Sequence, residues 1–179
     1  MADFKKDLQR GKYYEYKALK TLSKYKFKDL HIFEGYKKEY DIEGVYKKKK
    51  VYIEVKYSKY VSYTNSIFVE VFTTKFNISG LSATKSDYYI MYGYFRFWII
   101  ETENLKKALE EHLKNEIMIK NPTRCQLVEY VKLKGTYTNN TVGVIIPISI
   151  IEKYTKWTGV HNKKKLKAET KQVIKNMFN

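Results

Sequence analysis

The chain has little of what small disulfide-bonded or zinc-bound domains rely on. Its 179 residues include one cysteine, so no disulfide can form within the chain, and a reducing compartment suits this composition. The three histidines lie far apart in the sequence and lack the spacing of a zinc site. Only eight glycines and two prolines occur, which excludes a collagenous or low-complexity chain. With 44% hydrophobic residues, we expect a folded domain.

Long hydrophobic runs are also missing. The longest apolar-rich stretch, residues 88–100, is too short to span a bilayer and contains Arg96. The first residues, Met1-Ala2-Asp3-Phe4, contain no apolar signal core. We therefore expect no membrane span, no export signal and an intracellular, cytoplasmic protein.

Charge of one sign dominates what is present. Lysine and arginine number 35 against 19 aspartate and glutamate, which gives a net charge of +16 at pH 7. Such an excess on a small chain favours polyanionic partners, most often nucleic acid. An anionic membrane surface, or plain solubility, is the alternative explanation.

The order of the periodic segments predicts a single domain that mixes helices and strands. Helices are expected over 4–22 and, with Thr102 as N-cap, over 103–114. Strands are expected at 40–46, 51–57, 67–72, 87–92, 95–100, 126–132 and 143–146. We expect an α/β or α+β fold around one mixed sheet over residues 1–155, with 156–179 as a basic helical extension of the same domain.

Two of the expected strands form a hairpin with acidic residues on one face. A symmetric turn across Lys47 to Lys50 would place Asp41 opposite Lys56 and Glu43 opposite Glu54. Because side chains alternate along a strand, all four would project from one face. The other face would carry an apolar, core-facing set: Ile42, Val51, Ile53 and Val55.

Carboxylates placed this close repel one another unless a positive charge compensates them. A divalent hard cation is a common solution, because Mg²⁺ binds through one or two carboxylates and keeps several waters. The adjacent Lys56 can then orient or deprotonate a metal-bound water for attack on phosphorus. The alternative is a solvent-exposed strand face with a cross-strand ion pair between Asp41 and Lys56.

The first helix carries a further carboxylate on its apolar side. Glu15 falls within a stripe at helical spacing: Phe4, Leu8, Gly11, Ala18 and Leu22. A carboxylate that faces a core is costly without a partner. Glu15 therefore contacts either a metal or its water, or a buried Lys, Arg or Tyr, and the acidic hairpin favours the first interpretation.

The sequence resembles the PD-(D/E)xK nuclease superfamily in the spacing of these residues. Asp41 is followed, after twelve residues, by Glu54-Val55-Lys56 at the end of a strand, and a helix with Glu15 precedes them. This superfamily includes restriction endonucleases and archaeal-type Holliday junction resolvases. The resemblance implies an αβββαβ core with a central mixed sheet flanked by helices. It also implies Mg²⁺ dependence, with Mn²⁺ as a substitute. The proline that names the motif is absent, because Tyr40 precedes Asp41.

The same resemblance implies a role for each matching residue. Asp41, Glu54 and the backbone carbonyl of Val55 would be metal ligands, Lys56 the catalytic lysine, and Glu15 the helix glutamate beside the metal. The segments 68–71 and 79–89 are similar to those of small phage and mobile-element nucleases. Glu70 is then either an accessory acid or an ordinary strand residue. The resemblance covers residues 8 to 114 and leaves the C-terminal third unassigned.

Candidate nucleic-acid contacts are less specific. Lys85 precedes a strand and either touches phosphate or lies in a solvated loop. The basic C-terminal segment either clamps a DNA backbone or covers the core, and its first candidates are Lys163, Lys164 and Lys165. Of the 18 tyrosines, those nearest the site, Tyr57, Tyr60 and Tyr63, could stack on bases, although a Lys- and Tyr-rich composition also follows from an AT-rich genome.

Together these features predict a Mg²⁺-dependent deoxyribonuclease, most simply an endonuclease, that hydrolyses phosphodiesters with a metal-activated water. The alternative from another class is a nuclease-like domain that binds nucleic acid without cutting it. Within the enzyme interpretation, a resolvase of branched DNA would act as a homodimer to cut two strands. Duplex and branched DNA both remain open as substrates, and so does RNA.

Overall fold

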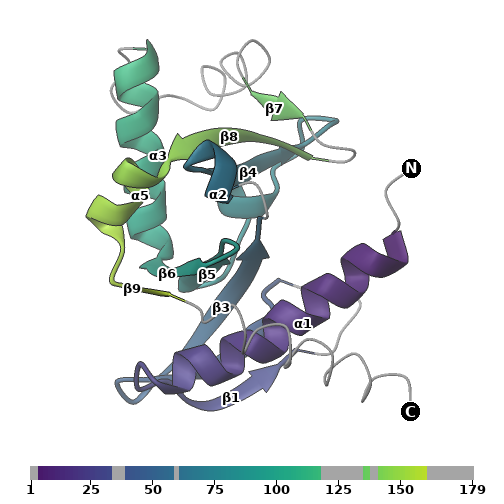
Figure 1. The fold of residues 1–179 in the computed structure, drawn as a ribbon, viewed down its shortest axis with the longest axis vertical. Coiled ribbons are helices and arrows are strands. Elements are labelled where there is room, and N and C mark those ends of the chain that lie inside the picture. The colour runs from purple at the N-terminus through teal and green to yellow at the C-terminus, as the bar shows by residue number, and fades with distance from the viewer. Residues whose placement is uncertain (1–3, 34–38, 59–60, 118–134, 138–140, 161–179) are drawn as a thin grey trace.

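The structure is a computed structural model that describes residues 4–33, 39–58, 61–117, 135–137 and 141–160 (Figure 1). Its first half contains α1 (Phe4–Ser23), β1 (Lys28–Ile32), β2 (Ile42–Tyr46), β3 (Lys49–Tyr57), α2 (Val61–Thr64) and β4 (Ser66–Thr73). After a 3₁₀ turn at Gly80–Ser82 come β5 (Tyr88–Tyr92), β6 (Arg96–Glu101), α3 (Thr102–Ile117), β7 (Thr136–Tyr137), β8 (Thr141–Pro147), α5 (Ile148–Tyr154) and β9 (Trp157–Val160).

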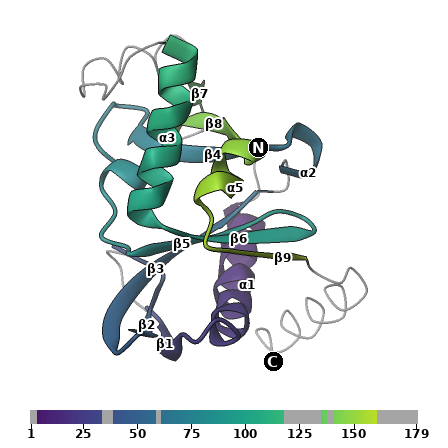
Figure 2. The ribbon, with the colours of Figure 1, turned by 90° about the vertical axis from the view of Figure 1, so that its left-hand side faces the viewer.

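The strands form two sheets. The larger has six strands in the order β1-β2-β3-β5-β6-β9, and the smaller has three in the order β4-β8-β7. Within the larger sheet β3 and β5 are parallel and the other neighbours are antiparallel. Figure 2 shows α1 on one side of the larger sheet and α3, α5 and β4 on the other. The predicted mixed fold with a mixed sheet is therefore confirmed, but the prediction of one sheet is wrong, because residues 67–72 and 143–146 belong to a second sheet.

Both faces of the larger sheet are buried, which gives the molecule two apolar cores. Toward α1, the core contains Ala18, Leu22, Ile42, Ile53 and Ile90 among others. On the opposite side, Trp98 and Ile100 pack with side chains of α3, α5 and the smaller sheet. All five residues of β5 are buried, because this strand is central and covered on both faces.

The turn between β2 and β3 differs from the predicted one. Lys47 and Lys48 both have positive φ, 50° and 65°, and Tyr46 pairs with Lys49, so the turn has two central residues and β3 begins at Lys49. Ile42 therefore pairs with Ile53, and the predicted pairing of Asp41 with Lys56 and of Glu43 with Glu54 is wrong. Because the register differs by two residues, every side chain keeps its predicted face.

The apolar side chains of this hairpin face the core, as the sequence predicts. Ile42 and Ile53 are fully buried, Val51 is buried, and Val55 packs against the same core. The predicted stripe on α1 is only partly right. Leu8 is 53% exposed, whereas Ala18, Leu22 and Glu15 are buried, so only the later turns of the helix pack on the sheet.

Other differences concern the C-terminal third. Residues 157–160 form β9 on the edge of the larger sheet, instead of beginning a helical extension, because they pair with β6. The predicted strand 126–132 and the basic segment with Lys163, Lys164 and Lys165 lie outside the described residues. The sequence interpretation did not include β1, α2, β7 or α5.

The two-residue turn predicts how substitutions there change the free energy of unfolding. Left-handed backbone costs about 1 kcal/mol for an ordinary residue, and hairpin turns with two such residues favour Asn-Gly. Replacing Lys47 by Asn together with Lys48 by Gly should raise the free energy of unfolding by about 1 kcal/mol. The same pair of changes at Lys49 and Lys50, which lie in β3, should lower it. Urea unfolding of both variants checks this, and equal stability of the two would contradict the assigned turn.

Candidate active site

The strand β3 carries three of the predicted site residues on its C-terminal half. Its parallel neighbour is β5, with Glu54 beside Tyr89 and Lys56 beside Met91. Asp41 lies immediately before β2, the antiparallel neighbour on the other side. The topology therefore brings the two parts of the motif together from adjacent strands.

A hydrogen bond fixes Asp41 against the motif on β3. Its Oδ2 atom accepts the backbone N–H of Val55 at 2.8 Å, and its own N–H donates to the carbonyl of Ile53 at 3.1 Å. The Asp41 carboxylate thus lies beside the backbone of Glu54-Val55-Lys56. This contact uses the backbone, so side-chain periodicity could not predict it.

Lys56 forms an ion pair within its own motif. Its Nζ atom lies 2.8 Å from Oε1 of Glu54, and the two side chains are 43% and 18% exposed. The lysine end of the site is therefore open to solvent, while the glutamate is mostly covered. Lys56 pairs with Glu54 and not, as the predicted register implied, across the strands with Asp41.

Negative charge accumulates around Asp41. Burial, the adjacent Glu54 carboxylate and the charge of Glu15 raise the pKa of Asp41 to about 6, against the opposing effects of the Val55 hydrogen bond and Lys56. Burial is the largest of these effects, and the neighbouring carboxylates add to it. A bound divalent cation would favour the ionised form of Asp41.

The surroundings of Lys56 favour its charged form. Burial acts to lower its pKa, but the negative charges of Glu54, Asp41 and Glu70 outweigh that effect, so the pKa of Lys56 lies above its ordinary value. The amine is therefore a charged ammonium at neutral pH. In this arrangement it serves as a hydrogen-bond donor and not as a base.

Glu15 reaches the site from α1. Only 8% of the residue is exposed, as its inward position in the helix predicts, and its charge contributes to the raised pKa of Asp41. The helix and the hairpin thus bring their carboxylates within electrostatic range. Glu15 is part of the acidic environment that the sequence pattern indicated.

Two residues of the site come from elsewhere in the chain. Glu70 of β4 raises the pKa of Lys56, and its Oε1 accepts a hydrogen bond from the Ser79 hydroxyl. Tyr89 of β5 has its pKa raised to about 12 by burial and by Glu54, so its phenol is neutral. The sequence pattern leaves the role of Glu70 open and contains no signal for Tyr89. A cavity of about 50 Å³ borders Lys56, Glu70 and Tyr89, with room for one or two water molecules.

The oxygen atoms of the site match the ligands that a hard metal ion prefers. Among the residues that the structure describes, no three His, Cys, Asp or Glu side chains are grouped as metal ligands. Mg²⁺ does not need such a group, because one or two carboxylates, a carbonyl and waters suffice. Asp41, Glu54 and the Val55 carbonyl are all oxygen donors in a region of excess negative charge. They fit a hard divalent cation, and the charge of Glu15 acts on the same region.

Lys85, a candidate phosphate contact, forms an ion pair with Glu39. Its Nζ is 2.7 Å from Oε1 of Glu39, two residues before Asp41, and the side chains are 65% and 53% exposed. An ion pair this exposed contributes little to stability and opens easily to a phosphate. Among the tyrosines named above, Tyr57 stacks on Tyr14 at 4.1 Å, Tyr63 is 86% exposed, and Tyr60 lies outside the described residues.

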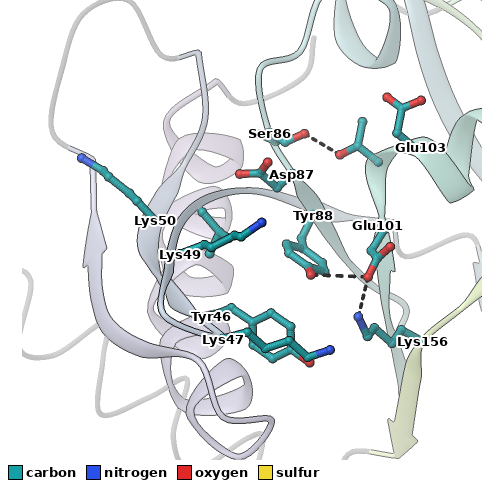
Figure 3. A pocket seen from close by; sticks show the side chains of 12 residues that line it. Tyr46, Lys47, Lys49, Lys50, Ser86, Asp87, Tyr88, Glu101, Glu103 and Lys156 are labelled. Atoms are coloured by element: carbon teal, nitrogen blue, oxygen red, sulfur yellow. Dashed lines mark hydrogen bonds and ion pairs between the residues drawn. The ribbon is translucent and has the colours of Figure 1, made fainter.

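A larger cavity of about 440 Å³ lies at the other end of β3, where Lys49 and Lys50 begin the strand (Figure 3). Its lining carries charges of both signs, among which Lys156 forms an ion pair with Glu101. Glu101 accepts hydrogen bonds from Lys156 and from the Tyr88 hydroxyl, and the Lys156 hydrogen bond holds its pKa below the usual range. Burial and neighbouring carboxylates raise the pKa of Asp41, whereas the ion pair with Lys156 lowers that of Glu101. The smaller site is therefore the better candidate for metal chemistry.

No known protein family, curated protein or solved structure matches the chain. Among the described residues, no helix is long and apolar enough to cross a membrane. Any functional assignment therefore rests on the geometry and electrostatics of the site.

Proposed function

We propose that this chain is a metal-dependent phosphodiesterase of the PD-(D/E)xK type. Within that class, we propose an endonuclease that hydrolyses DNA. The observation that carries the proposal is the position of Asp41 beside Glu54-Val55-Lys56. The pKa of Asp41 is raised there, and a bound divalent cation would lower it.

The topology supports the class. A helix, α1, is followed by the antiparallel strands β1, β2 and β3, and the chain then crosses over to β5, which is parallel to β3. This order is compatible with an αβββαβ core. The crossover departs from it, because it contains the short α2 and the strand β4 in place of one long helix.

Each residue has a chemical role in this proposal. Mg²⁺ or Mn²⁺ held by Asp41, Glu54 and the Val55 carbonyl would act as a Lewis acid and lower the pKa of a bound water. Lys56, kept as an ammonium, donates hydrogen bonds to the negative charge that develops on the phosphate. Glu15 and Glu70 add acceptors that orient water around this centre.

DNA is the proposed substrate because of the net charge of +16. The second candidate is a nucleic-acid-binding protein that does not cut, in which the Glu54–Lys56 ion pair is only structural. Affinity does not separate the two, since both predict binding that weakens steeply with salt. Cleavage does, and it also decides between duplex DNA, branched DNA and RNA. A resolvase would further require a homodimer.

The test is cleavage of supercoiled plasmid by the wild-type protein and by Lys56→Ala, with Mg²⁺, Mn²⁺ or EDTA. We expect metal-dependent nicking that falls on the order of 100-fold or more in the variant, because a preorganised donor to the transition state is lost. Lys50→Ala is the matched control. Lys50 lies on the same strand and the same face and also pairs with a glutamate, Glu43, at 3.1 Å.

Lys50→Ala should keep wild-type cleavage. Equal activity of Lys56→Ala and wild type would contradict the assigned role of the lysine. If no metal supports cleavage of plasmid, a four-way junction and a fork are tested next, and inactivity on all three would favour the non-catalytic candidate.

A further inference from the structure

A row of side chains crosses the larger sheet from Lys56 to the β5–β6 turn. Lys56 pairs with Met91 on β5, and Met91 pairs with Trp98 on β6, so the three share one face of the sheet. Neighbouring strands are about 4.8 Å apart, which places Trp98 roughly 10 Å from Lys56 across the sheet. Met91 and Trp98 are 3% and 1% exposed, so this row runs through the core, and Trp98 meets a cleft at the end of the row away from Lys56.

A cleft of about 240 Å³ lies at this end of the row, with Trp98 and Val61 in its wall and Gly93 beside them. A Cβ atom at Gly93 would lie 3.3 Å from Cγ1 of Val61, so a side chain there would fill the base of the cleft. The volume is below the range of about 300 Å³ and more that drug-sized ligands occupy. It suits a single ring system.

The rim of the cleft exposes two aromatic side chains. Tyr94 and Phe95 form the turn between β5 and β6, and they are 37% and 39% exposed, with their rings 4.6 Å apart at 88°. Turns usually carry small or polar residues. Exposed aromatic rings are the surfaces on which unpaired bases stack in proteins that bind single strands.

Polar groups at the mouth suit a nucleotide. Asn65 is exposed and lines the cleft, and its backbone is held by hydrogen bonds with Val61 and Ile148. Amides recognise the hydrogen-bonding edges of unstacked bases. The Arg96 guanidinium lies 5.4 Å from the Trp98 ring, contacts Glu152 at 2.6 Å and is 46% exposed, so it is accessible to a phosphate.

We propose that this cleft holds an unpaired base of the DNA substrate, and that the enzyme therefore acts on DNA with a single-stranded or branched segment next to the scissile phosphate. This inference rests on the proposed nuclease function. Duplex bases are stacked and paired and do not enter a cleft of this kind, whereas the net charge of +16 attracts any DNA backbone. The positive charge thus attracts duplex and single-stranded DNA alike, and the cleft selects DNA with an unpaired base.

The test measures binding in the presence of EDTA, in a Glu54→Gln background that does not cut. Two probes of equal length are compared, a blunt duplex and a fork with 2-aminopurine at its first unpaired position. We expect the fork to bind at least about tenfold more tightly and its fluorescence to fall when the base stacks. In the same background, Phe95→Ala and Tyr94→Ala should reduce fork affinity about tenfold and leave duplex affinity unchanged.

Two further variants serve as controls for the cleft. Tyr16→Ala removes a tyrosine on α1 that is 46% exposed and does not line the cleft, and it should change neither affinity. Phe95→Trp keeps an aromatic ring and should retain fork binding. Circular dichroism and melting temperature check that each variant folds.

Equal affinity for fork and duplex, or equal losses on both probes in the Phe95→Ala and Tyr94→Ala variants, would overturn the proposal. Because this readout is binding without turnover, it is separate from the plasmid assay. Cleavage of plasmid without any preference for the fork would overturn the cleft assignment alone. Fork-selective binding that depends on Phe95 would support the cleft even if Lys56→Ala cleaved normally, a result that would instead contradict the proposed catalytic site.

Discussion

Replacing Glu54 by glutamine is expected to abolish metal-dependent cleavage while leaving the fold intact. The change removes one of the two carboxylates proposed to hold the metal, and it also removes the ion pair that holds Lys56 at 2.8 Å. Glutamine has nearly the same shape, so the packing of β3 should persist. With both the metal ligand and the lysine orientation lost, the rate of plasmid nicking should fall on the order of 1000-fold.

The matched control for this variant is Glu43→Gln. Glu43 lies on the same face of the hairpin, pairs with Lys50 at 3.1 Å and would undergo the same change of charge. It should cut DNA at the wild-type rate. Calorimetric titration with Mn²⁺ gives a second readout, in which Glu54→Gln loses binding and Glu43→Gln keeps it. Normal turnover by Glu54→Gln would refute the assignment of the site to this strand.

The parts of the site that the sequence predicts are those governed by alternation along a strand. The apolar residues Ile42 and Ile53 are both fully buried, so the acidic residues next to them in the chain have to project from the opposite face. The inward position of Glu15 follows in the same way from helical periodicity. Such local rules hold because burial of an apolar face is the strongest constraint on either element.

The register of the hairpin lies beyond such rules. Four consecutive lysines, Lys47 to Lys50, offer no Asn-Gly or similar signal that would choose between a two-residue and a four-residue turn. The two alternatives differ by two residues and bury the same side chains, so the apolar pattern does not distinguish them either. Consequently the face was predictable, but the partners of Asp41 and Lys56 were not.

Residues that reach the site through long-range pairing were harder still to predict. Glu70 lies on β4, whose neighbour β8 is about seventy residues further along the chain. Tyr89 is beside Glu54 only because β5 is parallel to β3. Neither contact leaves a periodic trace in the sequence. The aromatic turn at Tyr94 and Phe95 likewise becomes a candidate binding site only when the order of the strands is known.

Replacing Asp41 by asparagine is expected to inactivate the enzyme and also to stabilise the metal-free fold at neutral and alkaline pH. In the folded protein the pKa of Asp41 is raised from 3.8 to about 6, first by burial and then by Glu54. The folded state therefore binds the Asp41 proton more tightly than the unfolded chain does. The stability that this proton contributes is fully present below about pH 4 and is lost as pH rises through 6.

The size of the effect follows from the shift. A difference of about two pKa units corresponds to at most about 3 kcal/mol at 1.36 kcal/mol per unit. Asparagine keeps an acceptor for the Val55 N–H and carries no charge. In EDTA, Asp41→Asn should be more stable than wild type by about 2 kcal/mol at pH 8, and the gap should close near pH 4. Urea unfolding measured across this range provides the test.

Glu43→Gln again supplies the comparison, because it removes the same charge but also an ion pair with Lys50, so it should gain no stability at pH 8. Adding Mg²⁺ should stabilise the wild-type protein and not Asp41→Asn, since ligand binding to the folded state alone raises its stability. If wild type and Asp41→Asn share one pH profile in EDTA, the pKa of Asp41 is not raised in the folded protein. The electrostatic argument for a cation between Asp41 and Glu54 would then fail, because it rests on that raised pKa.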